Sequence, residues 1–209
     1  AFLKRAFSWW DPVYLNVIDK TSIQNVLETY LDINVIINNA AIDPKVTDSS
    51  GPSGSFESLS LEEWNLSVDV MMKGTFLCSQ VFCPHFKKNG GGIVINISSD
   101  LGVIAPDQRI YKGSKKPITY SAAKHGIIGM TKYLATYYAD SNIRVNSLSP
   151  GGVYVNQPED FVERLTNLIP VGRMANRDEY KGSIVFLCSD ASSYMTGHNL
   201  IVDGGRTVW

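Results

Sequence analysis

Short apolar runs alternate with longer amphipathic stretches along most of the chain. The runs are rich in β-branched residues and have the length of strands, and the stretches between them repeat their apolar positions with a helical period. The predicted strands are residues 13–17, 33–37, 93–97, 143–148 and 199–202. Because such runs suit strands that helices cover on both faces, the pattern predicts an α/β fold with a parallel sheet.

Helices are predicted between the strands. Their ranges are 19–31, 60–88, 119–140 and 177–189. The clearest start is at Ser60, because Glu63 follows it three residues later as in a capping box. Segments 43–55 and 107–117 are rich in Gly, Pro, Ser and charged residues and are predicted to be loops. Since regular α/β alternation resumes after each loop, residues 1–209 are expected to form a single domain.

Composition makes several classes of function poor candidates. The 209 residues are 44% hydrophobic and 19% charged, and 19 Lys and Arg against 20 Asp and Glu leave a net charge of −1. Without a basic field, nucleic-acid partners and anionic membranes are not expected. No apolar run approaches the ~18 residues of a membrane span. The first residues do not have the apolar core of an export signal, so a cytoplasmic location is expected.

The cysteines and histidines do not suggest a metal site. Cys78, Cys83 and Cys188 are odd in number and lack C-x-x-C spacing, and the three histidines are scattered. The cysteines are therefore expected to be packed thiols in a reducing compartment.

Candidate chemistry gathers where the predicted strands end, which is where parallel sheets bind their ligands. The segments that follow three successive strands are Asn38-Asn39-Ala40, Ser98-Ser99 and Ser149-Pro150-Gly151-Gly152. The facing helix opens with Tyr120, and Lys124 follows four positions later on the same face. An ammonium beside a phenol favours the phenolate, so the pKa of Tyr120 is expected to fall below about 10. Ser99 can hydrogen-bond a substrate oxygen, and the Asn38 amide suits a cofactor contact.

Each feature also has an ordinary structural explanation. A Tyr-x-x-x-Lys pair is common on helices, and Asn-Asn-Ala or Pro-Gly-Gly after a strand is often a turn. The joint placement after successive strands makes coincidence a poor account. The pattern therefore indicates a proton-transfer site beside a cleft.

This ordered set of motifs resembles the short-chain dehydrogenase/reductase family, in its compact single-domain branch. The resemblance covers about residues 14–205, and its further segments are Asn16-Val17-Ile18-Asp19, residues 95–99 (INISS), 144–153 (RVNSLSPGGV) and 202–205 (VDGG). It implies a Rossmann-like doubly wound parallel sheet. It also implies an enzyme that transfers hydride between NAD or NADP and a carbonyl or secondary alcohol of a small-molecule substrate.

The resemblance implies roles for individual residues. Tyr120 becomes the general acid/base, Lys124 lowers its pKa and grips the nicotinamide ribose, and Ser99 orients the carbonyl. Ser99 is preferred to Ser98 because the family's serine stands three residues before a glycine, here Gly102. Residues implied to line the cofactor beside Tyr120 and Lys124 are Asn16, Val17, Asn38, Ala40, Pro150, Gly151 and Val153. A homodimer or homotetramer built on the two long helices is implied as well.

Two departures from the family's pattern stand out. Met71, three residues before Gly74, occupies the place of an Asn that supports a proton-relay water, so impaired turnover is expected. A Thr-Gly-x-x-x-Gly-x-Gly turn, whose amides take the pyrophosphate, does not precede Asn16. The sheet is therefore expected to lack the family's first two strands, and the chain to be a fragment of a longer polypeptide. The alternative is that strands 13–17 and 33–37 pair directly in a βαβ unit.

The substrate and the class of function leave alternatives open. The loop before Tyr120 carries four cations, Arg109, Lys112, Lys115 and Lys116. They favour an anionic substrate such as a phosphorylated or nucleotide-linked sugar, and a solvated charged loop is an equal alternative. Residues 116–132 and 154–203 resemble bacterial oxidoreductases of sugar and flagellin modification. The alternative function is a non-catalytic relative that binds a ligand or partner, which Met71 and the missing phosphate loop favour; a sugar dehydratase or epimerase is disfavoured.

Overall fold

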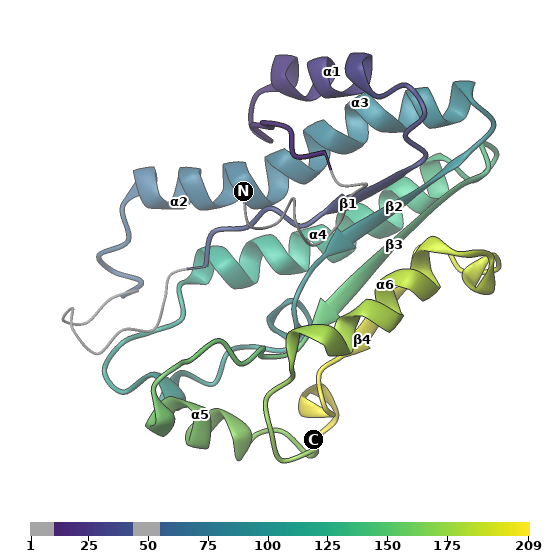
Figure 1. Cartoon of the computed structure of the whole chain (residues 1–209). Coiled ribbons are helices and arrows are strands. Elements are labelled where there is room, and N and C mark those ends of the chain that lie inside the picture. The colour runs from purple at the N-terminus through teal and green to yellow at the C-terminus, as the bar shows by residue number, and fades with distance from the viewer. Residues whose placement is uncertain (1–10, 44–54) are drawn as a thin grey trace.

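The computed structural model describes residues 11–43 and 55–209, and its centre is a parallel sheet (Figure 1). Within those residues four strands lie in the order β1-β2-β3-β4. They are β1 (Val35–Asn38), β2 (Gly92–Ile97), β3 (Ile143–Pro150) and β4 (Asn199–Val202). Each strand pairs with the next along the chain, so the crossovers add strands in one direction across the sheet. The α/β fold with a parallel, Rossmann-like sheet is confirmed.

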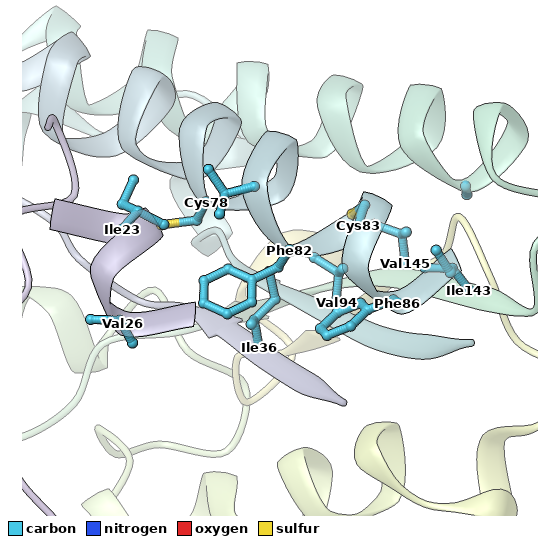
Figure 2. Close-up of a cluster of buried hydrophobic side chains, with 12 residues drawn as sticks. Ile23, Val26, Ile36, Cys78, Phe82, Cys83, Phe86, Val94, Ile143 and Val145 are labelled. Carbon is cyan, nitrogen blue, oxygen red and sulfur yellow. The ribbon is translucent and has the colours of Figure 1, made fainter. Parts of the chain in front are cut away.

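Helices cover both faces of the sheet (Figure 1). The helices of the described residues are α1 (Lys20–Thr29), α2 (Leu61–Val68), α3 (Gly74–Lys88), α4 (Ile118–Tyr137), α5 (Glu159–Thr166) and α6 (Lys181–Cys188), of which α2 and α5 lie away from the strands. The larger core cluster joins α1, α3 and the end of α4 to one face of β1, β2 and β3, and Figure 2 shows Phe82 and Phe86 of α3 within it. A second cluster joins α6 to the other face. Val94 and its neighbour Ile95 are both fully buried because they point to opposite faces, which explains the continuous apolar run in β2.

The helix predicted over 60–88 begins as expected but is interrupted. Ser60 Oγ accepts a hydrogen bond from the Glu63 backbone N–H at 3.1 Å, and the Glu63 carboxylate accepts one from the Ser60 N–H at 3.0 Å, so the capping box is confirmed. A π-helical turn, Asp69–Lys73, then separates α2 from α3. Met71 lies in the middle of this wider turn and is fully buried.

The predicted strand at 13–17 is wrong. Residues 11–18 have no strand pairing, and Asn16 begins a local turn in which its Oδ1 accepts a hydrogen bond from the Ile18 N–H at 3.2 Å. The Asp19 side chain then caps α1 by accepting from the Thr21 N–H. An asparagine that bonds its own backbone competes with strand pairing, so the apolar run stays in a loop. The βαβ alternative, which needed this strand, is wrong as well.

Other boundaries differ in smaller ways. The predicted helix 177–189 begins as a short 3-10 turn, Arg177–Tyr180, that leads into α6, and α5 was not expected. Most of the predicted loop 43–55 lies outside the described residues. Among the helices that the structure describes, none is long and apolar enough to cross a membrane.

Candidate active site

A cavity of about 760 Å³ lies at the carboxyl ends of β2 and β3. Ser99 follows β2, the turn from Pro150 to Val153 follows β3, and Tyr120 enters from the first turn of α4; all of them line the cavity. Lys124 lies one turn further along α4, with its Nζ 5.5 Å from the centroid of the Tyr120 ring. The fold therefore gathers the predicted Ser, Tyr and Lys with the Pro-Gly-Gly-Val turn.

The two adjacent serines have different surroundings. The buried Ser98 Oγ donates a hydrogen bond to the Lys124 backbone carbonyl at 2.8 Å and so ties β2 to α4. A Cβ at Gly102 would lie 2.4 Å from this oxygen, so only glycine permits the close approach. Ser99 lines the cavity instead, and its Oγ donates to Asp100 Oδ1 at 2.8 Å. Ser98 thus ties two elements of the fold together, and Ser99 is the serine that lines the cavity.

Two lysines lie close to the Tyr120 ring. Lys116 Nζ is 4.0 Å from the ring centroid and forms an ion pair with Asp43. Lys124 is buried, and its Nζ donates a hydrogen bond to the Ile97 carbonyl at 2.8 Å. Cations at these distances are attracted to the face of an aromatic ring.

The pKa values of this pair are set mainly by burial. Burial raises the pKa of Tyr120 far above its ordinary value, Asp43 and Asp100 add to the rise, and the Ser99 hydroxyl opposes it. The expectation that the pKa of Tyr120 falls below its ordinary value is therefore wrong. Burial lowers the pKa of Lys124 to about 8. Desolvation disfavours the charged form of each group, so at neutral pH Tyr120 is a phenol.

The remaining residues predicted to contact a cofactor lie on the β1 side and do not line this cavity. Asn38 Nδ2 donates to Asn96 Oδ1 at 2.8 Å, and Asn96 in turn donates to Thr131 on α4. Val17 packs so closely on Gly74 that a Cβ there would lie 2.9 Å from its Cγ2. The other two, Asn16 and Ala40, lie in loops. The Asn38 amide is thus already engaged in joining β1, β2 and α4.

Met71 is fully buried beside the site. It forms a small cluster with Ala123 and Ile127, and Met72 and Tyr120 pack against the cluster. Within the described residues, the Met71 thioether thus lies in apolar surroundings beside the Tyr120 ring.

Sequence reasoning missed two buried charged residues that line the cavity. Arg206, which follows β4, forms an ion pair with Asp100 at 2.6 Å, and both side chains are buried. The available signals were a charged residue directly after Ser99 and another directly after the pair Gly204-Gly205. Three of the four predicted loop cations are paired with carboxylates: Arg109 with Asp107, Lys112 with Asp160 and Lys116 with Asp43. Across the residues described, no cluster of His, Cys, Asp and Glu is placed to bind a metal ion.

Comparison with known proteins gives one consistent result. Residues 13–207 match the family described as Enoyl-(Acyl carrier protein) reductase. The 3-oxoacyl-[acyl-carrier-protein] reductase FabG of Thermotoga maritima is 34% identical over 206 residues, which cover 95% of this chain and 77% of FabG.

Solved structures agree with the sequence match. A short chain dehydrogenase from Leptospira borgpetersenii with bound NAD+ is 38% identical with a TM-score of 0.84, over 94% of this chain and 75% of that one. A gluconate 5-dehydrogenase from Burkholderia cenocepacia, in complex with NADP and tartrate, is 25% identical with a TM-score of 0.85, over 100% of this chain and 79% of that one.

Proposed function

The chain belongs to the short-chain dehydrogenase/reductase family of NAD(P)-dependent oxidoreductases, and we propose that Ser99, Tyr120 and Lys124 are the residues with which it interconverts a carbonyl and a secondary alcohol. The observation that supports this assignment most directly is the shared cavity of Ser99 and Tyr120, with Lys124 one turn away on α4.

The protonation state of Tyr120 defines what the site does to a carbonyl. A bound nicotinamide supplies or accepts the hydride. Tyr120 holds a proton on its phenolic oxygen at neutral pH and donates it to the substrate oxygen during reduction. Ser99 donates a hydrogen bond to the same oxygen. The Lys124 ammonium stabilises the phenolate that remains, because an opposite charge nearby favours the ionised form.

The cavity fits the nicotinamide end of NAD or NADP. An ammonium has three donors, and the Lys124 bond to the Ile97 carbonyl uses one of them, so further donors can hold ribose hydroxyls. The turn that begins at Pro150 is fixed to β4 by a 2.9 Å bond from the Gly151 N–H to the Val202 carbonyl. Its backbone would contact the nicotinamide.

Variants at Tyr120 and Lys124 test the assignment. We expect Tyr120→Phe and Lys124→Met to lower kcat by roughly 10²–10⁴, the usual contribution of a positioned acid or base. Nicotinamide absorbance is followed with a panel of ketones and secondary alcohols, and NAD and NADP are titrated into this chain and into its full-length gene product. Tyr133→Phe, an exposed tyrosine on the same helix, is the matched control and should keep the parent rate. A Tyr120→Phe variant with the parent rate contradicts the assignment.

For the substrate, we propose a reacting end at Ser99 and Tyr120 and an anionic end, such as the phosphate of a phosphorylated or nucleotide-linked sugar, toward Lys115 and Lys116. Both lysines line a second cavity of about 570 Å³, and Lys116 lines the first cavity too. Lys115→Glu should raise KM for a sugar phosphate but not for the unphosphorylated sugar. Arg109→Glu is the control, because Arg109 is already paired with Asp107. Equal KM values for both substrates in Lys115→Glu discard this substrate class.

The second candidate function, a ligand-binding relative without turnover, is supported by Met71. Binding of NAD or NADP without conversion of any carbonyl or alcohol in the panel would favour it. Recovery of turnover in Met71→Asn would assign the defect to the missing amide.

We also propose that α3 and α4 build a homodimer or homotetramer of a cytoplasmic protein. The exposed rings of Tyr133 and Tyr137 stack at 5.8 Å on α4, and Phe76 is half-exposed on α3. The three free thiols suit a reducing compartment. Tyr133→Lys combined with Tyr137→Lys should shift the mass measured by light scattering toward the monomer.

A further inference from the structure

A buried ion pair lies directly behind the Ser99 hydroxyl. Arg206 Nη1 and Asp100 Oδ2 are 2.6 Å apart, and each side chain is 6% exposed. The two residues are 106 positions apart in the sequence, Asp100 after β2 and Arg206 after β4. Replacing a buried pair of this kind with apolar side chains is often neutral or stabilising, so stability alone gives little reason for it.

Hydrogen bonds connect this ion pair to Ser99. Asp100 Oδ1 accepts one bond from the Ser99 hydroxyl at 2.8 Å and another from the Leu101 N–H at 2.8 Å. The Leu101 N–H also lies 3.1 Å from Ser99 Oγ. One carboxylate oxygen therefore faces the serine and the other faces the guanidinium. A serine side chain otherwise chooses among three staggered rotamers, and these contacts select one.

We propose that Asp100 and Arg206 are positioning residues for the reaction: Arg206 holds the Asp100 carboxylate, and the carboxylate holds the Ser99 hydroxyl at the wall of the cavity. The inference rests on the role proposed above for Ser99. Neither charged side chain has to touch the reacting carbon.

The arrangement also lowers the free-energy cost of breaking the hydrogen bond from the Ser99 hydroxyl to Asp100. Ser99 has one hydroxyl proton, so to donate to a substrate oxygen the O–H bond must rotate away from Asp100 while Oγ keeps its place. When it turns, Asp100 Oδ1 keeps the Leu101 N–H and Oδ2 keeps Arg206. The carboxylate is then still satisfied, and the serine does not leave an unpaired buried charge behind.

Crystal structures of three variants test the positioning role without any substrate. In Arg206→Met the Ser99 Oγ is expected to leave its rotamer, and in Arg206→Lys, which keeps the charge, it is expected to stay. Since Arg206→Met buries an unpaired carboxylate and can fail to fold, Asp100→Leu combined with Arg206→Met removes both charges; there too the serine is expected to lose its fixed place. An unchanged Ser99 rotamer in Arg206→Met and in the double variant overturns the proposal.

Kinetics of the same variants separate positioning from a structural role. With the folded fraction held constant, kcat of Arg206→Met should fall roughly 10–100-fold, the range set by a ~1 Å misplacement of a reacting group. In a Ser99→Ala background the same substitution should cause no further loss, whereas a structural role predicts multiplied losses. Arg173→Met, which breaks the exposed pair with Glu179, is the control and should keep the parent kcat. A parent chain that binds NAD or NADP but turns nothing over refutes the proposed function, and the crystal structures still decide the positioning role.

Discussion

Tyr120 and Lys124 are one helical turn apart, and burial moves their pKa values in opposite directions. The pKa of the phenol rises far above its ordinary range, and the pKa of the ammonium falls to about 8. At neutral pH the pair is therefore a phenol beside an ammonium, which is the form that donates a proton to a carbonyl. Sequence spacing correctly predicted that the two side chains lie together, because a helix fixes that locally. It could not predict the sign of the shift for Tyr120, which depends on how much of the fold covers the ring.

The lowered pKa of Lys124 gives the activity an upper pH limit. Since its pKa is about 8, the ammonium that supports Tyr120 is lost as pH rises through that value, so kcat/KM should fall above about pH 8. Arginine stays charged throughout, so the Lys124→Arg variant should lack this fall even if its absolute rate is lower. The measurement is kcat/KM against pH from 6 to about 10. A parent profile that is flat across this range contradicts the prediction.

The apolar surroundings of Met71 predict how substitutions at this position change stability. Met71→Asn should lower the free energy of unfolding by about 1–3 kcal/mol, because the amide enters an apolar cluster without an assured partner. Met71→Leu, the control, should cost less than ~1.5 kcal/mol. Urea unfolding measures both. If the Asn variant is as stable as the Leu variant, a polar group or a water molecule hydrogen-bonds the new amide at this position, and the prediction is wrong.

At the scale of elements, the junction of β2 and α4 depends on Gly102. A Cβ there would lie 2.4 Å from Ser98 Oγ and 2.9 Å from the Lys124 carbonyl group. Because backbone cannot move aside as a flexible side chain can, Gly102→Ala should push α4 away from β2. We expect a loss of about 1–3 kcal/mol in unfolding free energy, as for other overpacked sites, and a lower kcat.

Gly182→Ala on α6 is the matched control for Gly102→Ala. Nothing lies within 4 Å of an added Cβ at this exposed helical position. Alanine should therefore stabilise the protein there by about 0.5–1 kcal/mol. Equal stability changes in the two variants would contradict the account of the Gly102 contact.

Hydrophobic periodicity predicted most elements because it reports burial on one or both faces. It failed at 13–17, where Asn16 bonds its own backbone, and it did not predict the π-helical turn inside 60–88. It also missed α5, although the buried Phe161 and Leu165 of this eight-residue helix lie four positions apart on one face. A pattern of apolar residues fixes which face is buried, but local hydrogen bonds decide where an element stops or widens.

At the scale of the whole molecule, the exposed edge of the sheet at β1 predicts that the chain associates with other copies of itself. In the described residues β1 pairs with β2 alone, and Ile37 is 45% exposed. Exposed apolar strand edges template further strand pairing. Ile37→Lys should therefore reduce concentration-dependent association in light scattering. Val185→Lys, an exposed change on α6, should leave it unaltered, and equal effects of the two would point to net charge rather than to the edge.

The spacing of residues along the sequence could not predict contacts between distant segments. The ion pair of Asp100 and Arg206 is the clearest example of such a contact. It closes a loop of 106 residues. The entropic cost of such a closure grows with loop length, so nearer contacts form first, and β4 must dock beside β3 before Arg206 can arrive. During refolding, helical circular dichroism should therefore recover before the serine acquires its fixed place. Docking of β4 therefore sets when the site is completed: Ser99 is expected to acquire its fixed position only after this strand has paired with β3.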